Sequence, residues 1–203
     1  MSPTRVVAVA FALIILTGGL LLTLPAAARD GQSHGFLTGL FTATSATCVT
    51  GLVLGDTWTL WSGFGQVVIL CLIEIGGLGF MSVASTVIFL LKRKLGLRHR
   101  MVMAQALSVS DMASVVRLQK WAVLGSIAIQ LTGALILTLR FLPCFGLEQA
   151  ATWGIFHAVS AFCHAGFDIF STIAPNASVI TFNNDPVVCS SIMACQVVGR
   201  LVL

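Results

Sequence analysis

The feature that most constrains the fold of this chain is a short motif that occurs twice. Residues 39–52 read GLFTATSATCVTGL and residues 154–167 read GIFHAVSAFCHAGF, at a constant offset of 115 residues. Each copy lies between long apolar segments, so the repeat predicts two quasi-equivalent units around a shared path. The identical positions are Gly39, Phe41, Ala43, Ser45, Ala46, Cys48 and Gly51, which recur as Gly154, Phe156, Ala158, Ser160, Ala161, Cys163 and Gly166.

The segments that flank the motifs predict an all-α integral membrane protein. The chain is 57% hydrophobic and 9% charged, whereas a soluble domain carries about a quarter charged residues. A membrane-spanning helix needs roughly 20 apolar residues. The expected spans are 6–24, 61–91, 121–139 and 186–203. Arg5 and the alanines at 26–28 imitate a signal peptide, but the apolar core between them is longer than the usual range of about 7–15 residues.

The order of segments predicts parallel repeats of membrane helix, pore loop and membrane helix, because two spans return the chain to the same side. We expect the first repeat at 1–91 and a cytoplasmic connector at 92–114. The second repeat follows at 115–203 and is truncated in its last helix. Within the connector, residues 101–114 are either an amphipathic cytoplasmic helix or a plain linker.

Basic residues cluster directly after the second span. The positive-inside bias makes this loop cytoplasmic, which places the amino terminus inside and both motifs outside. Arg29 and Arg140, near the outer ends of spans, are mild exceptions. The cluster is a topology determinant or a site for anionic lipid, and the chain shows no nucleic-acid-binding module. The clustered residues are Lys92, Arg93, Lys94, Arg98 and Arg100.

Each motif begins with a predicted helix, at 36–46 and 149–161, that is too short to span a membrane. Non-helical backbone at membrane depth is tolerated only where protein buries it or water lines it. A helix that enters part-way and turns back as an extended strand meets that condition. Its carboxyl end carries partial negative charge, which favours a cation.

The extended segments after these short helices are the candidate ion selectivity filter. Successive backbone carbonyls in such a segment can replace an ion's hydration shell. Aiming them at one axis needs unusual φ/ψ values, which glycine adopts without a Cβ penalty. The alternative is that Gly51 and Gly166 simply end the short helices as C-caps. The filter residues are Cys48, Val49, Thr50 and Gly51, with Cys163, His164, Ala165 and Gly166.

Five polar residues are candidates for the pore mouth or for support of the loops. We expect the hydroxyls of Ser45 and Ser160 to support the loops rather than contact the ion. Asp56 and Asp168 follow the loops, where they either concentrate cations at the outer mouth or cap loops. Glu74 lies inside the second span, where an ionisable group is costly, and we expect it to pair with another helix.

The cysteines and histidines show no zinc-site spacing. Cys48 and Cys163 are small loop residues or, being equivalent, partners in a disulfide bridge. For His164 we expect the backbone carbonyl to face the ion, with the side chain packed behind the loop. A membrane enzyme built on His157, Cys163 and His164 needs a base–nucleophile geometry. Neither histidine recurs in the first motif, so we expect no enzyme.

These motifs resemble those of the TrkH/TrkG/KtrB/HKT superfamily of potassium transporters. TATSATCVTGL is similar to the first pore loop of that family, HAVSAFCHAGFDIFS to its second, and IEIGGLGFM to its glycine-rich helix after the first loop. The segment MSPTRVVAVAFALIILTGGLLLTLP is similar to the start of KtrB-like members, which argues against a cleaved signal. The likeness covers most of residues 1–185.

The resemblance implies a potassium-channel-like fold with four consecutive units in one chain, of which Gly51 and Gly166 would be two of the four filter glycines. In plant members a serine at the first filter glycine accompanies sodium preference, so Gly51 favours potassium. The resemblance also implies a multi-pass protein of the cell membrane that works as a homodimer or with another pore-forming half. It further implies a cytosolic nucleotide-binding regulatory ring, and no cofactor or metal beyond the transported potassium ion.

The chain departs from the family pattern in three ways. His164 replaces the usual asparagine. The segment 195–200 only weakly resembles IEIGGLGF, with Arg200 near the position of Leu78. The third and fourth units are absent, so we expect a fragment or truncated product, or a half-pore that pairs with another chain.

The predicted function is passive inward transport of potassium through a carbonyl-lined filter. Two alternatives stay open. One is a non-conducting fragment, or a structural or regulatory membrane subunit. The other is a simpler cation channel with two pore loops per chain.

Overall fold

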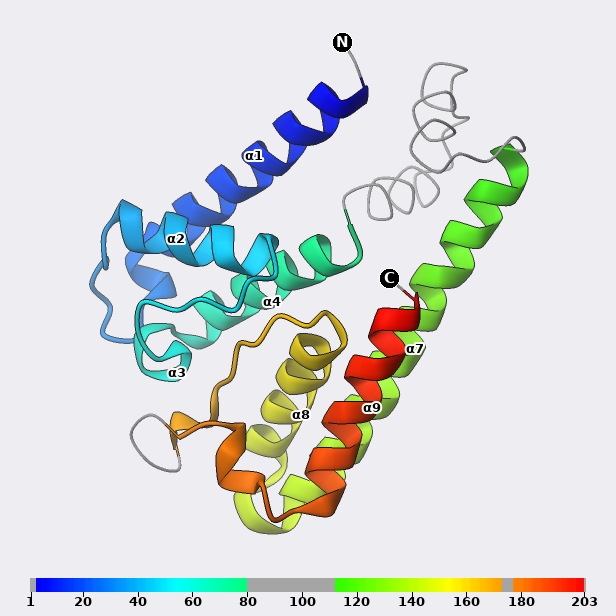
Figure 1. Cartoon of the computed structure of the whole chain (residues 1–203). Helices are drawn as coiled ribbons and strands as arrows, with labels where there is room; N and C mark the ends of the chain where they lie inside the picture. Colours follow the sequence, from blue (N-terminus) through cyan, green and yellow to red (C-terminus); the bar gives the residue numbers. More distant parts are fainter. Residues whose placement is uncertain (1–2, 80–111, 173–176, 203) are drawn as a thin grey trace.

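The computed structural model describes residues 3–79, 112–172 and 177–202. Helices make up most of this described part, and the only β-type pairing in it is an isolated bridge between Ala28 and Trp61. The all-α expectation is confirmed at this level. The α-helices (Figure 1) are α1 (Pro3–Thr23), α2 (Phe36–Thr47), α3 (Thr57–Leu60), α4 (Gly63–Gly77), α7 (Met112–Phe145), α8 (Leu147–Phe162) and α9 (Pro186–Val202), with 3-10 turns η1 (Pro25–Ala27), η2 (Phe170–Thr172) and η3 (Val179–Phe182).

Local sequence signals explain where several helices begin. The Ser62 hydroxyl accepts a hydrogen bond from the Gly65 N–H (3.3 Å) and so caps the start of α4. A serine or aspartate in this position satisfies one of the free N–H groups of a first turn. At the start of α9, Asp185 accepts from the Val187 N–H (3.1 Å), and Pro186 occupies the first helical position, where proline loses no hydrogen bond.

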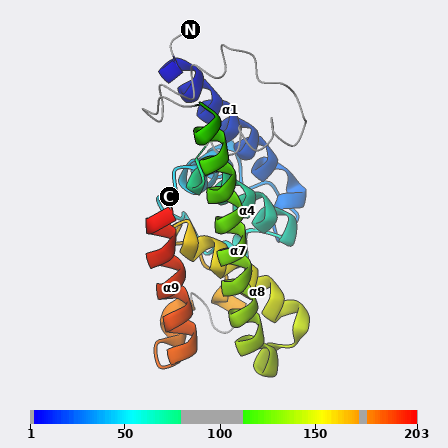
Figure 2. The ribbon, with the colours of Figure 1, turned by 90° about the vertical axis from the view of Figure 1, so that its right-hand side faces the viewer.

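The helices form two groups that meet between α4 and α8. In one group α1 packs against α2 and α4, and in the other α7 packs against α8 and α9. Figure 1 shows the two groups, and Figure 2 shows α7 extending beyond its own group to the level of α1. The carboxyl ends of α2 and α8 both reach the zone where the groups meet (Figure 1).

The long apolar segments are helical where they are described. Within the described residues, the stretch Lys120–Phe145 is long and apolar enough to cross a membrane by length and composition. Three further apolar helices, Ala8–Thr23, Gly63–Gly77 and Pro186–Val202, are shorter. The expected spans at 6–24, 121–139 and 186–203 therefore coincide with α1, α7 and α9, and the helix expected at 61–91 is described only as far as α4.

Most of the predicted connector lies outside the described residues, as does its basic cluster. Residues 112–114, which we assigned to the connector, belong to α7. The boundaries of the two predicted units, and the side of the membrane on which the amino terminus lies, stay predictions.

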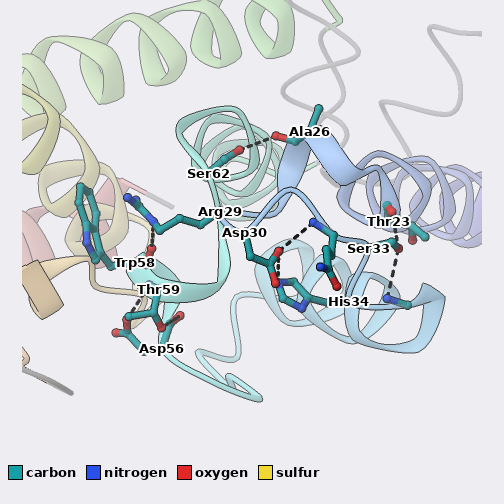
Figure 3. Close-up of polar contacts among 12 residues, drawn as sticks. Thr23, Ala26, Arg29, Asp30, Ser33, His34, Asp56, Trp58, Thr59 and Ser62 are labelled. Carbon is teal, nitrogen blue, oxygen red and sulfur yellow. Dashed lines mark hydrogen bonds and ion pairs between the residues drawn. The ribbon is translucent and has the colours of Figure 1, made fainter.

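The two arginines that stood out as exceptions to the charge pattern both have local partners. The Arg29 Nε donates to the Trp58 carbonyl (2.6 Å), and its guanidinium carbon lies 3.9 Å from the centre of the Trp58 ring (Figure 3). Arg140 Nε lies 2.7 Å from a carboxylate oxygen of Asp185. Arg29 thereby ties the segment after α1 to α3, and Arg140 ties α7 to the start of α9.

An aromatic cluster fills the second group beside the end of α7. Phe141 and Trp153 meet edge to face with centroids 5.8 Å apart, and Phe170 lies 5.0 Å from Trp153. Phe182 of η3 packs on Phe170 at 4.8 Å. Such pairs add to the burial of their large side chains, and they anchor the segment that follows α8 to α7 and η3.

Candidate functional site

The short helix α2 ends in a specific hydrogen-bonded turn. Its C-cap is Cys48, with φ −85° and ψ 0°. The Val49 N–H donates to the Ala46 carbonyl (3.3 Å), and the Thr50 N–H donates to the Ser45 carbonyl (3.0 Å). These two bonds define a Schellman motif, which satisfies carbonyls that a helix end otherwise leaves free.

The short helix α8 ends in the same turn, with every partner 115 residues later. Its C-cap is Cys163, with φ −80° and ψ −1°. The His164 N–H donates to the Ala161 carbonyl (3.1 Å), and the Ala165 N–H donates to the Ser160 carbonyl (2.8 Å). Two segments that share half of the positions of a short motif therefore share the backbone geometry of its end.

Left-handed backbone occurs at every second residue of both segments. Val49 has φ 55° and His164 has φ 59°, while Gly51 and Gly166 both have φ 72°. The residue that closes each helix is therefore Val49 or His164, and the glycine lies two positions further on. The alternative that Gly51 and Gly166 end the helices as C-caps is wrong.

The left-handed position explains one departure from the family pattern. Asparagine and histidine are among the non-glycine residues that enter this region most readily, so His164 fits a position at which the resemblance of the motif led us to expect asparagine. A β-branched residue there is a genuine outlier, and Val49 carries that strain at a candidate functional segment, where strained residues concentrate.

The two segments lie side by side at their glycines. A Cβ added to Gly51 would lie 2.8 Å from the Ala165 carbonyl oxygen and 3.5 Å from the Gly166 Cα. A Cβ added to Gly166 would meet the Gly51 Cα at 3.5 Å. Three of the predicted filter residues, Gly51, Ala165 and Gly166, are therefore neighbours across the two segments, although the segments are far apart in sequence.

The hydroxyls of Ser45 and Ser160 are engaged with the segments that follow their own helices. The Thr50 hydroxyl donates to Ser45 Oγ (3.0 Å), and Ser160 Oγ donates to the Phe167 carbonyl (2.7 Å). Both serines are buried. These hydrogen bonds connect each serine to the segment that follows its helix, and its supporting role at a pore stays a prediction.

Asp56 and Asp168 both make local hydrogen bonds. Asp56 Oδ2 accepts from the Thr59 N–H (2.8 Å) and caps α3, and the Ser171 hydroxyl donates to Asp56 Oδ1. Asp168 accepts from the Ser178 side chain and the Phe170 backbone. Burial raises the pKa of Asp168 above its ordinary value, the bond from Ser178 opposes that rise, and the nearby Asp56 adds to it. The loop-capping role is thus present at both residues.

The Glu74 carboxylate faces α7 and the second segment. Gln130 Nε2 of α7 donates to both carboxylate oxygens, at 3.2 and 3.0 Å, and the Cys163 thiol lies 3.6 Å from Oε2. Glu74 therefore pairs with another helix, as its position in an apolar span led us to expect.

In the described part of the chain, the ring of His157 is bound by backbone groups and not by a cysteine thiol. The ring of His157 is buried between two backbone groups, with Nδ1 2.7 Å from the Trp153 carbonyl and Nε2 accepting from the Ile169 N–H (3.4 Å). Since Nε2 accepts, Nδ1 carries the proton and donates, and His157 links α8 to the segment beyond Gly166. Cys48 and Cys163 are both free thiols.

The side chain of His164 is exposed. The expectation that it packs behind the loop is therefore wrong for the described part of the chain. Cys48 and Thr50 of the first segment are likewise exposed, whereas Cys163 is buried.

The short helices sit on the preceding long helices through equivalent glycines. A Cβ at Gly39 would lie 2.7 Å from the Gly19 carbonyl oxygen, and a Cβ at Gly154 would lie 2.7 Å from the Ala134 carbonyl oxygen. Both separations are too short for a real side chain, so each glycine permits backbone contact between α2 and α1 or between α8 and α7.

The helices that follow the segments also use glycine to approach the short helices. A Cβ at Gly76 of α4 would collide with the Thr47 carbonyl, and a Cβ at Gly199 of α9 would collide with the Phe162 carbonyl. Gly199 is therefore the structural counterpart of Gly76, and Arg200 is the counterpart of Gly77. The sequence alignment had placed Arg200 near Leu78, one residue further along.

Comparison with known proteins identifies the family. The profile of the TrkH family, described as cation transport protein, matches residues 2–201. The chain belongs to the TrkH family. It is 44% identical over 169 residues to the potassium/sodium uptake protein NtpJ of Enterococcus hirae, a match that covers 83% of this chain and 38% of that protein.

Two further relatives are components of Ktr systems. The Ktr system potassium uptake protein B of Bacillus subtilis is 41% identical over 187 residues, which cover 92% of this chain and 40% of the relative. Its namesake in Vibrio alginolyticus is 32% identical over 197 residues, covering 97% of this chain and 42% of the relative. The chain spans about two fifths of the length of the curated relatives that it matches. Membership in a transporter family also supports a membrane location.

Two residues at this site, Gln130 and Ser171, escaped the sequence reasoning, and so did the structural role of His157. Gln130 is an amide within an otherwise apolar span, and that isolation is a usable signal. Ser171 lies 115 residues after Asp56, so the repeat offset itself points to it. His157 stacks on Phe170 at 3.8 Å, a linking role that no spacing pattern announces.

Proposed function

We propose that this chain supplies two units of a potassium-conducting pathway through a membrane, lined by backbone carbonyls of residues 48–51 and 163–166. The observation that carries the proposal is the matched geometry of the two segments: the same helix-end turn, a glycine at φ 72° in each, and those glycines side by side. On this proposal, the remaining parts of the pathway come from chain beyond the part described, or from a second chain.

The alternation of left-handed residues supports a carbonyl-lined path. In a regular extended strand, neighbouring carbonyls point to opposite sides. A left-handed residue at every second position, as at Val49 and Gly51 or at His164 and Gly166, brings successive carbonyls towards one side. Carbonyls arranged in this way replace the water around a monovalent cation.

The two short helices that precede the segments also favour a positively charged ion. α2 and α8 end at Thr47 and Phe162, directly before the proposed filter, and their C-caps are its first residues, Cys48 and Cys163. A helix carboxyl end carries roughly half a negative charge, so the two ends together favour a cation at the place where the groups meet. Asp56 and Asp168, beyond the segments, add carboxylates on the proposed outer side.

The choice of potassium rests on relatives. One is named for uptake of potassium or sodium and two for uptake of potassium. A monovalent cation is the common element, and potassium is the proposed cargo, moving inward through the filter. The proposal includes assembly as a homodimer or with another pore-forming half, and regulation by a cytosolic nucleotide-binding ring, as the resemblance implies.

The test is rubidium uptake in potassium-uptake-deficient cells. One strain expresses this chain alone, and a second expresses a chimera in which the chain replaces the matching segment of the Bacillus subtilis relative. The intact relative is the positive control. We expect the chimera to take up rubidium, and we expect Gly51→Ser to alter or abolish that uptake.

The other outcomes separate the alternatives. Uptake by the chain alone would show that two-loop chains assemble into a channel without further units. An expressed, membrane-inserted chimera that takes up no rubidium, beside an active control, would refute the proposal and leave a structural or regulatory subunit as the better account.

A further inference from the structure

We propose that Glu74 of α4 is a positioning residue for the second filter segment, which it holds by accepting a hydrogen bond from the Cys163 thiol, and that this contact tunes which ion the pathway prefers. The inference rests on the proposed function. It adds a link between α4, the helix that follows the first segment, and the second segment. The family comparison does not assign this link.

The cluster consists of three side chains from three elements. Glu74 Oε2 lies 3.0 Å from Gln130 Nε2 and 3.6 Å from Cys163 Sγ, while Oε1 lies 3.2 Å from the same Gln130 nitrogen. Gln130 is 7% exposed and Cys163 is 3% exposed. Hydrogen bonds in such poorly solvated surroundings are stronger than in water, and losing one partner leaves the others unsatisfied.

Cys163 lies at the start of the second filter segment, so a shift of its side chain would move the backbone of that segment. Cys163 is the C-cap of α8, and His164 and Gly166, the left-handed residues of the second segment, follow it directly. A Cβ at Gly77 would lie 2.5 Å from Cys163 Sγ, so only a glycine there lets α4 approach closely. The end of α4 thus touches the turn that sets the second segment.

The first segment has no such support within the described residues. Gly199 matches Gly76 in its contact with the short helix, so the α9 counterpart of Glu74 is Val197, which is exposed and apolar. Cys48, the counterpart of Cys163, is exposed. Within the described residues, the polar cluster is therefore present at the second segment alone.

The test compares Glu74→Met with Glu74→Gln in the chimera. Methionine keeps the length of the side chain but removes both acceptor oxygens, whereas glutamine keeps one. We expect Glu74→Met to change the rubidium-to-sodium uptake ratio by about two- to tenfold, the range that one hydrogen bond carries, and Glu74→Gln to retain the ratio. Cys163→Ala should shift the ratio in the same direction, and combining it with Glu74→Met should add little.

The matched control is Gln66→Met on the same helix. Gln66 is buried and donates to the Trp61 carbonyl (3.1 Å), far along α4 from Gly77. The Gln66→Met substitution should lower the amount of folded protein without changing the rubidium-to-sodium uptake ratio. Equal shifts from Gln66→Met and Glu74→Met, or independent effects of Glu74→Met and Cys163→Ala, would overturn the inference.

A second measurement on this chain needs no transport. Maleimide labelling in detergent, mapped by peptide mass spectrometry, should leave Cys163 unmodified in the unaltered chain and modify it in Glu74→Met. If Cys163 stays protected in Glu74→Met, the positioning contact is refuted. If the chimera takes up no ion while labelling behaves as expected, the proposed function fails and the contact stands.

Discussion

Replacing either filter glycine by alanine should have unequal effects, although the two positions match in sequence and in backbone angle. Gly51 and Gly166 both have φ 72°. A non-glycine residue in left-handed backbone costs about 1–2 kcal/mol. That cost applies equally to Gly51→Ala and Gly166→Ala.

The surroundings of the two glycines differ. The new methyl of Gly51→Ala would lie 2.8 Å from the Ala165 carbonyl oxygen, whereas that of Gly166→Ala would meet only the Gly51 Cα, at 3.5 Å. The second separation is an ordinary van der Waals contact. The first forces a backbone carbonyl to move, and overpacking of this kind costs about 1–3 kcal/mol. We therefore expect a total of about 2–5 kcal/mol for Gly51→Ala and about 1–2 kcal/mol for Gly166→Ala.

The carbonyl that must move belongs to the proposed filter, so function should follow the same order. Stability is measured by reversible unfolding of the purified chain in mixed detergent micelles, and rubidium uptake is measured in the chimera. Gly51→Ala should lose more of both than Gly166→Ala. Equal losses, or a larger loss for Gly166→Ala, would refute the close approach of Gly51 to Ala165 and with it the side-by-side placement of the segments.

Three further predictions use the same unfolding assay. Val49→Asn should raise the free energy of unfolding by up to about 1 kcal/mol, since asparagine enters left-handed backbone more readily than valine. His164→Asn should change the free energy of unfolding by less than about 0.5 kcal/mol. Equal effects of the two substitutions would contradict the strain at Val49. Asp56→Ala should destabilise by about 1–2 kcal/mol through loss of the α3 cap, and a neutral result would show that the cap contributes nothing. Asp168→Asn should raise the free energy of unfolding at neutral pH, because burial raises the pKa of Asp168 and so makes its charged form unfavourable in the folded chain. The difference in stability between variant and unaltered chain should shrink as pH falls from the raised pKa towards the ordinary one. A difference that grows on acidification would contradict the burial.

The sequence predicted the elements of the fold well because its signals were local or repeated. The apolar runs located α1, α7 and α9, and the repeated motif located α2 and α8 to within two residues at each end. The contacts of Ser45 and Ser160 with the segments after their helices also followed from the motif, since both precede their segments by the same spacing.

Contacts between the two groups were not predictable in the same way. The approach of the Cys163 thiol to Glu74 depends on how the end of α4 packs on a segment 89 residues further along the chain. The exposed side chain of His164 depends on which residue closes the helix. The glycine pattern correctly predicted unusual backbone at Gly51 and Gly166. It could not show that Val49 and His164 also take the left-handed position, against ordinary backbone preference.

The most direct test of a shared ion path is to locate a bound ion. Crystals of the chimera grown with thallium(I), a potassium substitute with strong anomalous scattering, would give an ion position without reference to uptake. The account predicts an anomalous peak coordinated by carbonyl oxygens from both 48–51 and 163–166. Peaks elsewhere, or none at these segments in a chimera that transports rubidium, would contradict it.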